Sequence, residues 1–258
     1  MRGVRGEAVG RDIYFSVIVA SYNSANTISD ALESLLAQTY KSFELILVDG
    51  NSKDSTINIV KEYCEKLHVS HLISEDDSGI SEAWNKGLEV ARGEFVLFLN
   101  ADDYWPPLYL RTIKDELNSE LRRGQSGCVY YGATQMVSTD GVFTRLVDKK
   151  FNAKLLGVGF RFMHTSCVVS RQLYQKVGKF DEDVKIAIDT DWLLRAYKQG
   201  ADFKKLSHTN YMREGGVSDE FRVAAYDEYL SRAKAQNILT FPAWFYKAIM
   251  RVWSCFKK

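Results

Sequence analysis

Apolar runs and helical apolar patterns alternate along the first hundred residues. Short runs rich in β-branched and aromatic residues predict buried strands at 14–20, 43–49, 70–75 and 94–100. Between them, apolar residues recur every three or four positions, which predicts helices beginning near Ile28, Thr56 and Ile80. Gly93 follows the third of these helices and is expected to be its C-cap. Strands alternating with helices indicate a mostly parallel central sheet with helices on both faces.

Polar residues follow several of these strands at the point where each ends. They are ASYN (20–23), Asp49 and NADD (100–103). In open α/β sheets, ligands bind beyond the carboxyl ends of the strands. Ordinary turns would explain any one of these segments, because Asn, Asp and Ser are common in turns. The set together favours a ligand site, because Asp49 and Asp102 would share one rim with no Lys or Arg beside them in the sequence.

The ligand class is narrowed by motifs that the sequence lacks. There is no GxGxxG after the first predicted strand and no GxxxxGK[ST], so the common dinucleotide-binding and P-loop turns are excluded. A phosphate ligand would need its charge balanced in another way. Carboxylates such as Asp102 suit Mg²⁺ or Mn²⁺, which can join a protein carboxylate to a diphosphate. The expected cofactor is therefore a divalent metal.

Longer motifs carry a family resemblance. The first set is SVIVASYNSANTISDALESLLAQTYKSFELILVDGNSKDST followed by SGISEAWNKGLEVARGEFVLFLNADD, and the second is FMHTSCVVSRQLYQKVGKFDEDVKIAIDTDWLLRAYKQG with YMREGGVS. The sequence resembles the family 2 inverting glycosyltransferases with the GT-A fold, most of all the bacterial enzymes that build exopolysaccharide, capsule and O-antigen. The resemblance extends to about residue 220.

The resemblance implies an α/β fold of the GT-A (nucleotide-diphospho-sugar transferase) type. It also implies transfer of a hexosyl or N-acetylhexosaminyl group from a nucleotide-diphosphate donor, with a UDP-sugar expected first. The acceptor would be a hydroxyl of a glycan or of a polyprenyl-diphosphate-linked sugar in cell-surface polysaccharide synthesis. A non-catalytic nucleotide-sugar-binding subunit and a sugar nucleotidyltransferase are the alternatives. The second of these would need a Gly-rich, basic loop that ASYNSAN does not provide.

Donor-binding roles follow from the same resemblance. The first loop would hold the base and ribose through Ala20, Tyr22 and Asn23. Asp49 would accept a hydrogen bond from the base. A later segment would close over the nucleotide, with its lysine also near a phosphate, through Asp77, Asn85 and Lys86.

The segment Asn100-Ala101-Asp102 occupies the place of the family's DxD signature. Asp102 is therefore the expected metal ligand, and Asn100 and Ala101 are expected to contact the nucleotide sugar. The sequence departs from the signature because Asn100 replaces its first Asp. An amide can still bond a ribose hydroxyl, but it lowers the negative charge at the metal. Asp103 is expected to support the metal through water or to cap the next turn.

Inverting transfer also needs a base that deprotonates the acceptor hydroxyl. The segment IAIDTDWLLR sets Asp189 and Asp191 at the start of a predicted helix, and in the family an acid here supplies the base. Asp189 aligns better. One of the two would instead be an N-cap or a first-turn acid favoured by the helix dipole.

Other polar residues allow two interpretations each. His164 lies near the family's acceptor segment, but a lone histidine is as often structural. The segment MREGGVS (212–218) is either a hinged lid that brings Arg213 to the diphosphate or a plain surface turn. His208 is a weaker candidate for any role.

The C-terminal segment 241–258 is amphipathic, with Trp and Phe on one helical face and Lys and Arg beside it. This pattern predicts a helix in a membrane interface, or one packed against protein. The expected organisation is a flexible tail, a nucleotide-sugar-binding half, an acceptor and base half, and a C-terminal helical segment, at 1–13, 14–105, 106–225 and 226–258.

Composition suits either one large globular domain or one domain plus an appendage. The chain has 258 residues, of which 46% are hydrophobic, and a net charge of +1, which gives no argument for nucleic acid as a partner. Its scattered cysteines predict reduced thiols. Without a recognisable signal or a long apolar run, the expected location is the cytoplasm, and the segment 241–258 would allow peripheral contact with the inner face of the membrane.

Overall fold

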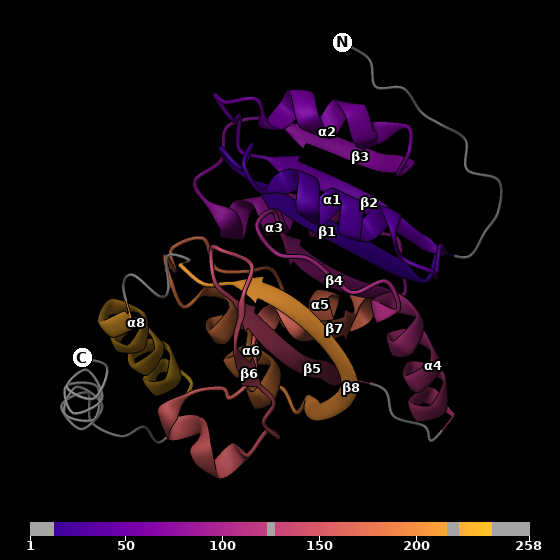
Figure 1. The fold of residues 1–258 in the computed structure, drawn as a ribbon. Helices are drawn as coiled ribbons and strands as arrows, with labels where there is room; N and C mark the ends of the chain where they lie inside the picture. The colour runs from indigo at the N-terminus through magenta and orange to yellow at the C-terminus, as the bar shows by residue number, and fades with distance from the viewer. Residues whose placement is uncertain (1–12, 123–126, 216–221, 239–258) are drawn as a thin grey trace.

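The structure is a computed structural model that describes residues 13–122, 127–215 and 222–238 (Figure 1). The predicted tail, apart from Ile13, and the predicted helix at 241–258 lie outside these ranges. The described residues contain an eight-stranded sheet in the order β3-β2-β1-β4-β7-β5-β6, with β8 also paired to β5. Its strands are β1 (Phe15–Ser21), β2 (Phe43–Asp49), β3 (Val69–Ser74), β4 (Phe95–Asn100), β5 (Cys128–Val137), β6 (Phe143–Val147), β7 (Cys167–Ser170) and β8 (Asp202–Arg213).

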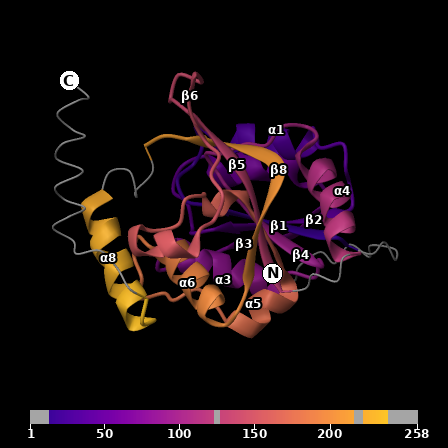
Figure 2. The ribbon, with the colours of Figure 1, turned by 90° about the horizontal axis from the view of Figure 1, so that it is seen from below.

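Helices cover both faces of this sheet (Figures 1 and 2). They are α1 (Ile28–Leu36), α2 (Thr56–Cys64), α3 (Ile80–Val90), α4 (Tyr109–Leu121), α5 (Arg171–Val177), α6 (Ile188–Lys198) and α8 (Arg222–Ala235), with 3-10 turns η1 (Ala153–Val158) and η2 (His164–Ser166). The strands and helices predicted for the first hundred residues are confirmed, with strand ends shifted by one residue or less.

Strand β1 is buried on both faces, as its uninterrupted apolar run predicted. Val17 and Val19 face one core together with residues of α1 and α4, whereas Ile18 and Ala20 face the other, with residues of α3 and α6. Strands β1 to β4 pair in parallel, so crossover helices bury both of their faces. Strand β3 lies at the sheet edge, and its side chains alternate between half-buried and exposed.

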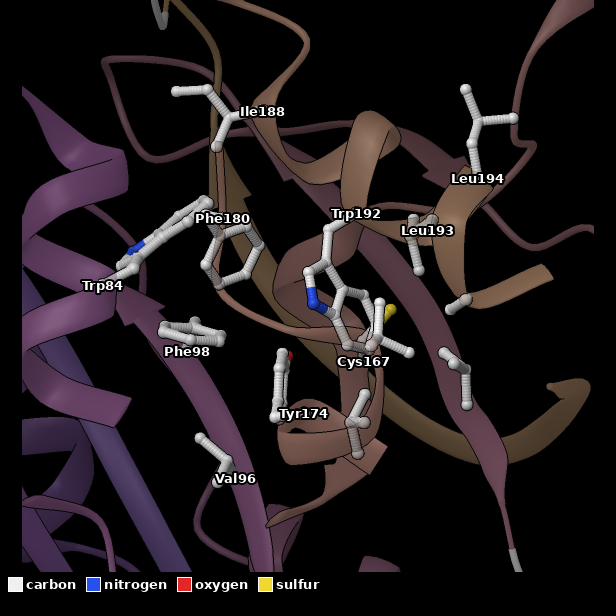
Figure 3. Close-up of a cluster of buried hydrophobic side chains, with 14 of the residues drawn as sticks. Trp84, Val96, Phe98, Cys167, Tyr174, Phe180, Ile188, Trp192, Leu193 and Leu194 are labelled. Carbon is white, nitrogen blue, oxygen red and sulfur yellow. The ribbon is translucent and has the colours of Figure 1, made fainter. Parts of the chain in front are cut away.

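The core that contains Ile18 and Ala20 also packs around the start of α6 (Figure 3). Trp192 is fully buried and packs against Tyr174 of α5, with ring centroids 4.4 Å apart. Its indole N–H donates to the carbonyl of Gly178 at 2.8 Å. Phe98 of β4 packs against Trp84 of α3 in the same cluster. The base of α6 is therefore held by rings from several elements.

The C-cap predicted at Gly93 is wrong. Helix α3 ends at Val90, and its C-cap is Ala91 in an extended conformation. Gly93 instead passes close to β1, where a Cβ atom would lie 2.5 Å from the backbone nitrogen of Ser16. Its N–H donates to the Ser16 hydroxyl at 2.8 Å. The glycine is required by close approach between chain segments rather than by a left-handed turn.

The sheet continues from the predicted nucleotide half into the predicted acceptor half. Strand β7 lies antiparallel between β4 and β5, and β8 runs parallel to β5. Helix α8 packs beside α6 at one end of the molecule (Figures 1 and 2). The division near residue 105 therefore remains a functional prediction within one continuous sheet.

Candidate active site

A cavity of about 1080 Å³ lies beyond the carboxyl ends of β1 and β4. Its other walls come from the η2 turn, the first turn of α6, the end of β8 and one face of α8. The predicted site residues that line it are Ala20, Tyr22, Asn23, Asn100, Ala101, Asp102, Asp103, His164, Asp189 and Arg213. The chain thus brings the loops after β1 and β4 together with a helix nearly ninety residues further on. Asp49, Asp77, Asn85, Lys86 and Asp191 lie outside this lining.

Arg213 brings a positive charge near the two carboxylates after β4, and its side chain contacts this turn through a backbone carbonyl. Its backbone N–H donates to Asp103 Oδ1 at 3.0 Å, and its Nη1 donates to the Asp102 carbonyl at 2.7 Å. Its other end forms an ion pair with Asp30 of α1. The absence of a nearby Lys or Arg in the sequence was therefore misleading, because β8 supplies one from more than a hundred residues away.

Asp103 is turned into the protein. It is 1% exposed, and its second oxygen accepts a bond from the Asn100 amide at 3.1 Å. Burial, followed by the charge of Asp102, raises the pKa of Asp103 well above its ordinary value. These bonds engage both oxygens of the Asp103 carboxylate and shape the turn after β4.

The residues after β4 fit a metal that arrives with a diphosphate. Asp102 is half-buried, and burial raises the pKa of its carboxyl group. Within the described ranges, no three His, Cys, Asp or Glu side chains lie close enough together to hold a metal ion. Mg²⁺ and Mn²⁺ do not need three such side chains, since a carboxylate, phosphate oxygens and waters complete their shell. Nearby, Asn100 Oδ1 is buried without a hydrogen-bond partner, and a ligand hydroxyl is one group that could supply the missing bond.

The two acids of α6 have different surroundings. Asp189 is half-buried and lines the cavity, whereas Asp191 is 3% exposed and pairs with Arg195 at 2.9 Å. Both lie in the first turn, where the helix dipole favours acids. The N-cap is Ala187, so neither acid caps the helix. Burial raises the pKa of Asp189, and the N–H of Thr190 offsets this in part.

Asp49 ties the strand ends together. It is 1% exposed and accepts hydrogen bonds from the hydroxyls of Ser21 and Ser74, each at 3.1 Å, and from the Ser52 N–H at 2.9 Å. These donors come from β1, β3 and the loop after β2. The structure shows Asp49 as an anchor of the loops beside the cavity.

The segment around α3 is also occupied by protein contacts. The Asn85 amide donates to the Phe180 carbonyl at 3.0 Å and accepts from its N–H at 2.9 Å. Lys86 pairs with Glu75 and Glu82, both at 3.0 Å. Their bonds join α3 to its neighbours.

Asp77 borders the loop after β2. Its carboxylate accepts the Gly79 N–H at 3.0 Å, and burial raises its pKa. A Cβ atom on Gly50 would lie 2.9 Å from Asp77 Oδ2. The two loops are therefore in close contact at this point.

His164 lines the cavity as a neutral ring. It is 4% exposed and packs against the rings of Trp84, Phe98 and Phe180. Burial lowers its pKa to about 3, and neither ring nitrogen has a hydrogen-bond partner. His208 differs, because its Nε2 contacts the Ser166 carbonyl at 2.9 Å in the interior.

Sequence reasoning missed several cavity residues. Trp84 fits the apolar spacing of α3, yet it also lines the cavity, with an indole N–H that lacks a hydrogen-bond partner. Tyr226 and Tyr229 of α8 form part of the wall. Nothing in the local pattern of α8 indicates which face meets the cavity.

Residues 16–178 match the family described as Glycosyl transferase family 2. The chain belongs to this family. A family member from Mycobacterium tuberculosis, a PGL/p-HBAD biosynthesis glycosyltransferase, is 28% identical over 215 residues, which cover 80% of this chain and 79% of that protein. An uncharacterized glycosyltransferase of Rickettsia prowazekii is 27% identical over 191 residues, covering 71% of this chain and 58% of that protein.

Solved structures show the same GT-A type of fold. Staphylococcus aureus TarS matches with a TM-score of 0.63 and 25% identity, over 85% of this chain and 43% of TarS. The mannosyltransferase PcManGT from Pyrobaculum calidifontis, in complex with GDP-Man and Mn²⁺, matches with a TM-score of 0.60 and 21% identity, over 88% of this chain and 65% of that protein. The family 2 chain thus spans less than half of TarS and 58% of the Rickettsia protein.

Proposed function

We propose that this family 2 protein is an inverting glycosyltransferase that uses a nucleoside diphosphate sugar as donor. The observation that carries the proposal is the cavity shared by the Asn100–Asp102 turn and the Asp189 carboxyl group. A displacement at an anomeric carbon needs these two functions: charge stabilisation for the leaving diphosphate and a base for the incoming hydroxyl.

Asp189 is proposed as the base. Its carboxylate takes the proton of the acceptor hydroxyl while the oxygen forms a bond to the anomeric carbon. The bond from that carbon to the diphosphate oxygen breaks on the opposite face, and its electron pair leaves with the diphosphate. Burial raises the pKa of Asp189, which makes its ionised form a stronger base.

The part of the cavity lined by Asp102 and Arg213 would receive the diphosphate. Arg213 lies beside Asp102 with a guanidinium that donates in a planar fork, a geometry suited to phosphate. Asp102 would hold Mg²⁺ or Mn²⁺, which when bound stabilises charge on the departing diphosphate. The unpartnered Asn100 Oδ1 would accept a bond from a ribose hydroxyl.

Polar atoms without hydrogen-bond partners in residues that line the cavity would suit a sugar. The indole N–H of Trp84 is a donor, and the neutral His164 ring supplies one donor and one acceptor. Buried donors and acceptors are costly without hydrogen-bond partners, and a sugar hydroxyl can pair with either. We therefore propose that His164 contacts the acceptor hydroxyl.

A UDP-sugar is the donor that we propose first. A TarS structure of the same fold was solved with UDP-GlcNAc, and the PcManGT structure holds GDP-Man, so a GDP-sugar is the second choice. The acceptor would be a cell-surface glycan or its polyprenyl-diphosphate-linked precursor. The part of the chain that the structure describes contains no helix long and apolar enough to span a bilayer.

The test is calorimetric titration of UDP, GDP and dTDP into the protein with and without Mn²⁺, followed by turnover of the matching nucleotide sugar. One nucleotide should bind more tightly with Mn²⁺, and Asp102→Ala should lose that dependence. Asp189→Asn should keep nucleotide binding and lose turnover. Binding without turnover by the wild type would indicate a non-catalytic subunit, and binding of none of the nucleotides would overturn the proposal.

A further inference from the structure

Glu228 of α8 binds consecutive backbone N–H groups in the segment that leads into α6. The Lys185 N–H donates to its Oε1 at 2.9 Å, and those of Ile186 and Ala187 donate to Oε2 at 2.8 and 2.7 Å. Partial burial opposes ionisation, but these bonds and the Arg232 guanidinium outweigh it, so the pKa of Glu228 lies below its ordinary value. The carboxylate is charged at neutral pH, and its bonds are charge-assisted.

The segment held by Glu228 forms the wall from which Asp189 projects. Ile186 and Ala187 line the same cavity as Asp189. Ala187 is also the N-cap of α6, two positions before the proposed base. A displacement of these backbone atoms therefore moves the Asp189 carboxyl group, and a misplacement of about 1 Å can reduce a rate about 100-fold.

Helix α8 is itself docked firmly enough to act as an anchor. The Arg232 guanidinium donates to Asp181 at 2.7 Å, on the loop before the same segment. The hydroxyls of Tyr226 and Tyr229 donate to backbone carbonyls of the η1 turn. Glu228 thus connects the catalytic wall to a helix that has separate attachments.

We infer that Glu228 is a positioning residue that fixes the segment before α6, so that Asp189 faces the acceptor hydroxyl in the cavity. The inference rests on the proposed function of Asp189. Its structural part, the anchoring of residues 185–187, can be measured without any substrate.

Water provides a probe that needs no identified acceptor. In hydrolysis of the donor, the water oxygen bonds to the anomeric carbon, the bond from that carbon to the diphosphate oxygen breaks, and Asp189 takes the proton. We propose measuring this hydrolysis with UDP-GlcNAc and GDP-mannose, together with hydrogen–deuterium exchange of the peptide that contains residues 185–187.

The variants are graded by how many bonds each retains. Glu228→Ala removes all three acceptors. Glu228→Gln keeps one carbonyl oxygen, which can still accept two of the bonds, while its NH₂ group opposes the third N–H. Glu62→Gln is the matched control, because it removes the charge of an exposed glutamate on α2.

The expected result for Glu228→Ala is faster exchange at residues 185–187 and hydrolysis at least about tenfold slower, with Glu228→Gln between it and the wild type. The Kd for the nucleotide should stay within about twofold. A tenfold change in Kd corresponds to about 1.4 kcal/mol, and these variants leave the residues proposed to bind the nucleotide, Asn100, Asp102 and Arg213, unaltered. Glu62→Gln should match the wild type in each measurement. All rates are compared at a temperature at which every variant is folded.

Two results would overturn the inference. Unchanged exchange in Glu228→Ala would show that other contacts hold the segment. Faster exchange with an unchanged hydrolysis rate would show that the anchor does not position the base. Nucleotide binding without hydrolysis by the wild type would instead refute the proposed function, and the catalytic role of Glu228 with it, whereas the exchange data would still decide the anchoring.

Discussion

Replacing Asp191 by Asn should destabilise the fold and spare the chemistry, and replacing Asp189 by Asn should do the reverse. Asp191 is 4% exposed at its side chain and pairs with Arg195, which is 20% exposed, at 2.9 Å. Breaking a fully buried pair costs about 3–5 kcal/mol and breaking an exposed one about 0–1 kcal/mol. The partly covered geometry of this pair gives a cost of about 2–3 kcal/mol.

For a domain of this size, such a cost lowers the melting temperature by about 4–12 °C. Asp189→Asn should leave the melting temperature unchanged or raise it. Burial raises the folded-state pKa of Asp189, so its ionisation costs stability as pH rises from the ordinary carboxyl pKa through the raised one. At neutral pH, a neutral amide removes that cost. Turnover should nevertheless fall by about 10²–10⁴-fold, the usual contribution of a positioned base.

The assay pairs thermal unfolding followed by circular dichroism with hydrolysis of the nucleotide sugar at 20 °C, where both variants remain folded. Asparagine is nearly isosteric with aspartate, so each variant is the other's control. The assignment would be refuted if Asp191→Asn lost turnover with an unchanged melting temperature while Asp189→Asn kept its activity.

Further consequences can be measured in the same system. Gly93→Ala should cost about 1–3 kcal/mol in urea unfolding, because its Cβ would press on the Ser16 backbone, and an unchanged midpoint would contradict this contact. Arg213→Met should weaken UDP or GDP binding about tenfold in calorimetry, and an equal Kd would exclude it from the diphosphate wall. Turnover should rise with pH through a pKa above that of an ordinary aspartate, since Asp189 acts ionised; a rise already complete at the ordinary value would exclude it as the base.

Local pattern was enough to predict the strands and helices of the first hundred residues. Strand β1 is buried on both faces, so its uninterrupted apolar run marks it clearly. The polar residues after β1, β2 and β4 were predicted to share one rim, because parallel strands deliver their carboxyl ends to one edge. Asn23 and Asp102 line the same cavity, whereas Asp49 lies outside its lining.

Long-range contacts explain what the sequence could not predict. Arg213 reaches Asp103 because β8 pairs with β5, and no local signal encodes such a pairing. Gly93 resembles a helix stop, but it is needed where two chain segments touch. The role of Glu228 depends on the docking of α8, whose own sequence shows only a helical pattern.

The reversed direction of β7 has a consequence for how this protein can diversify. Because β7 runs antiparallel to β4, the η2 turn before β7 brings His164 to the cavity lining at the end of β4. The loop after β4 and the η2 turn before β7 therefore line one cavity from opposite chain directions, on adjacent strands. Insertions before β7 would leave the register of β1, β2 and β4 intact, so one side of the cavity can change in length while the other side is preserved.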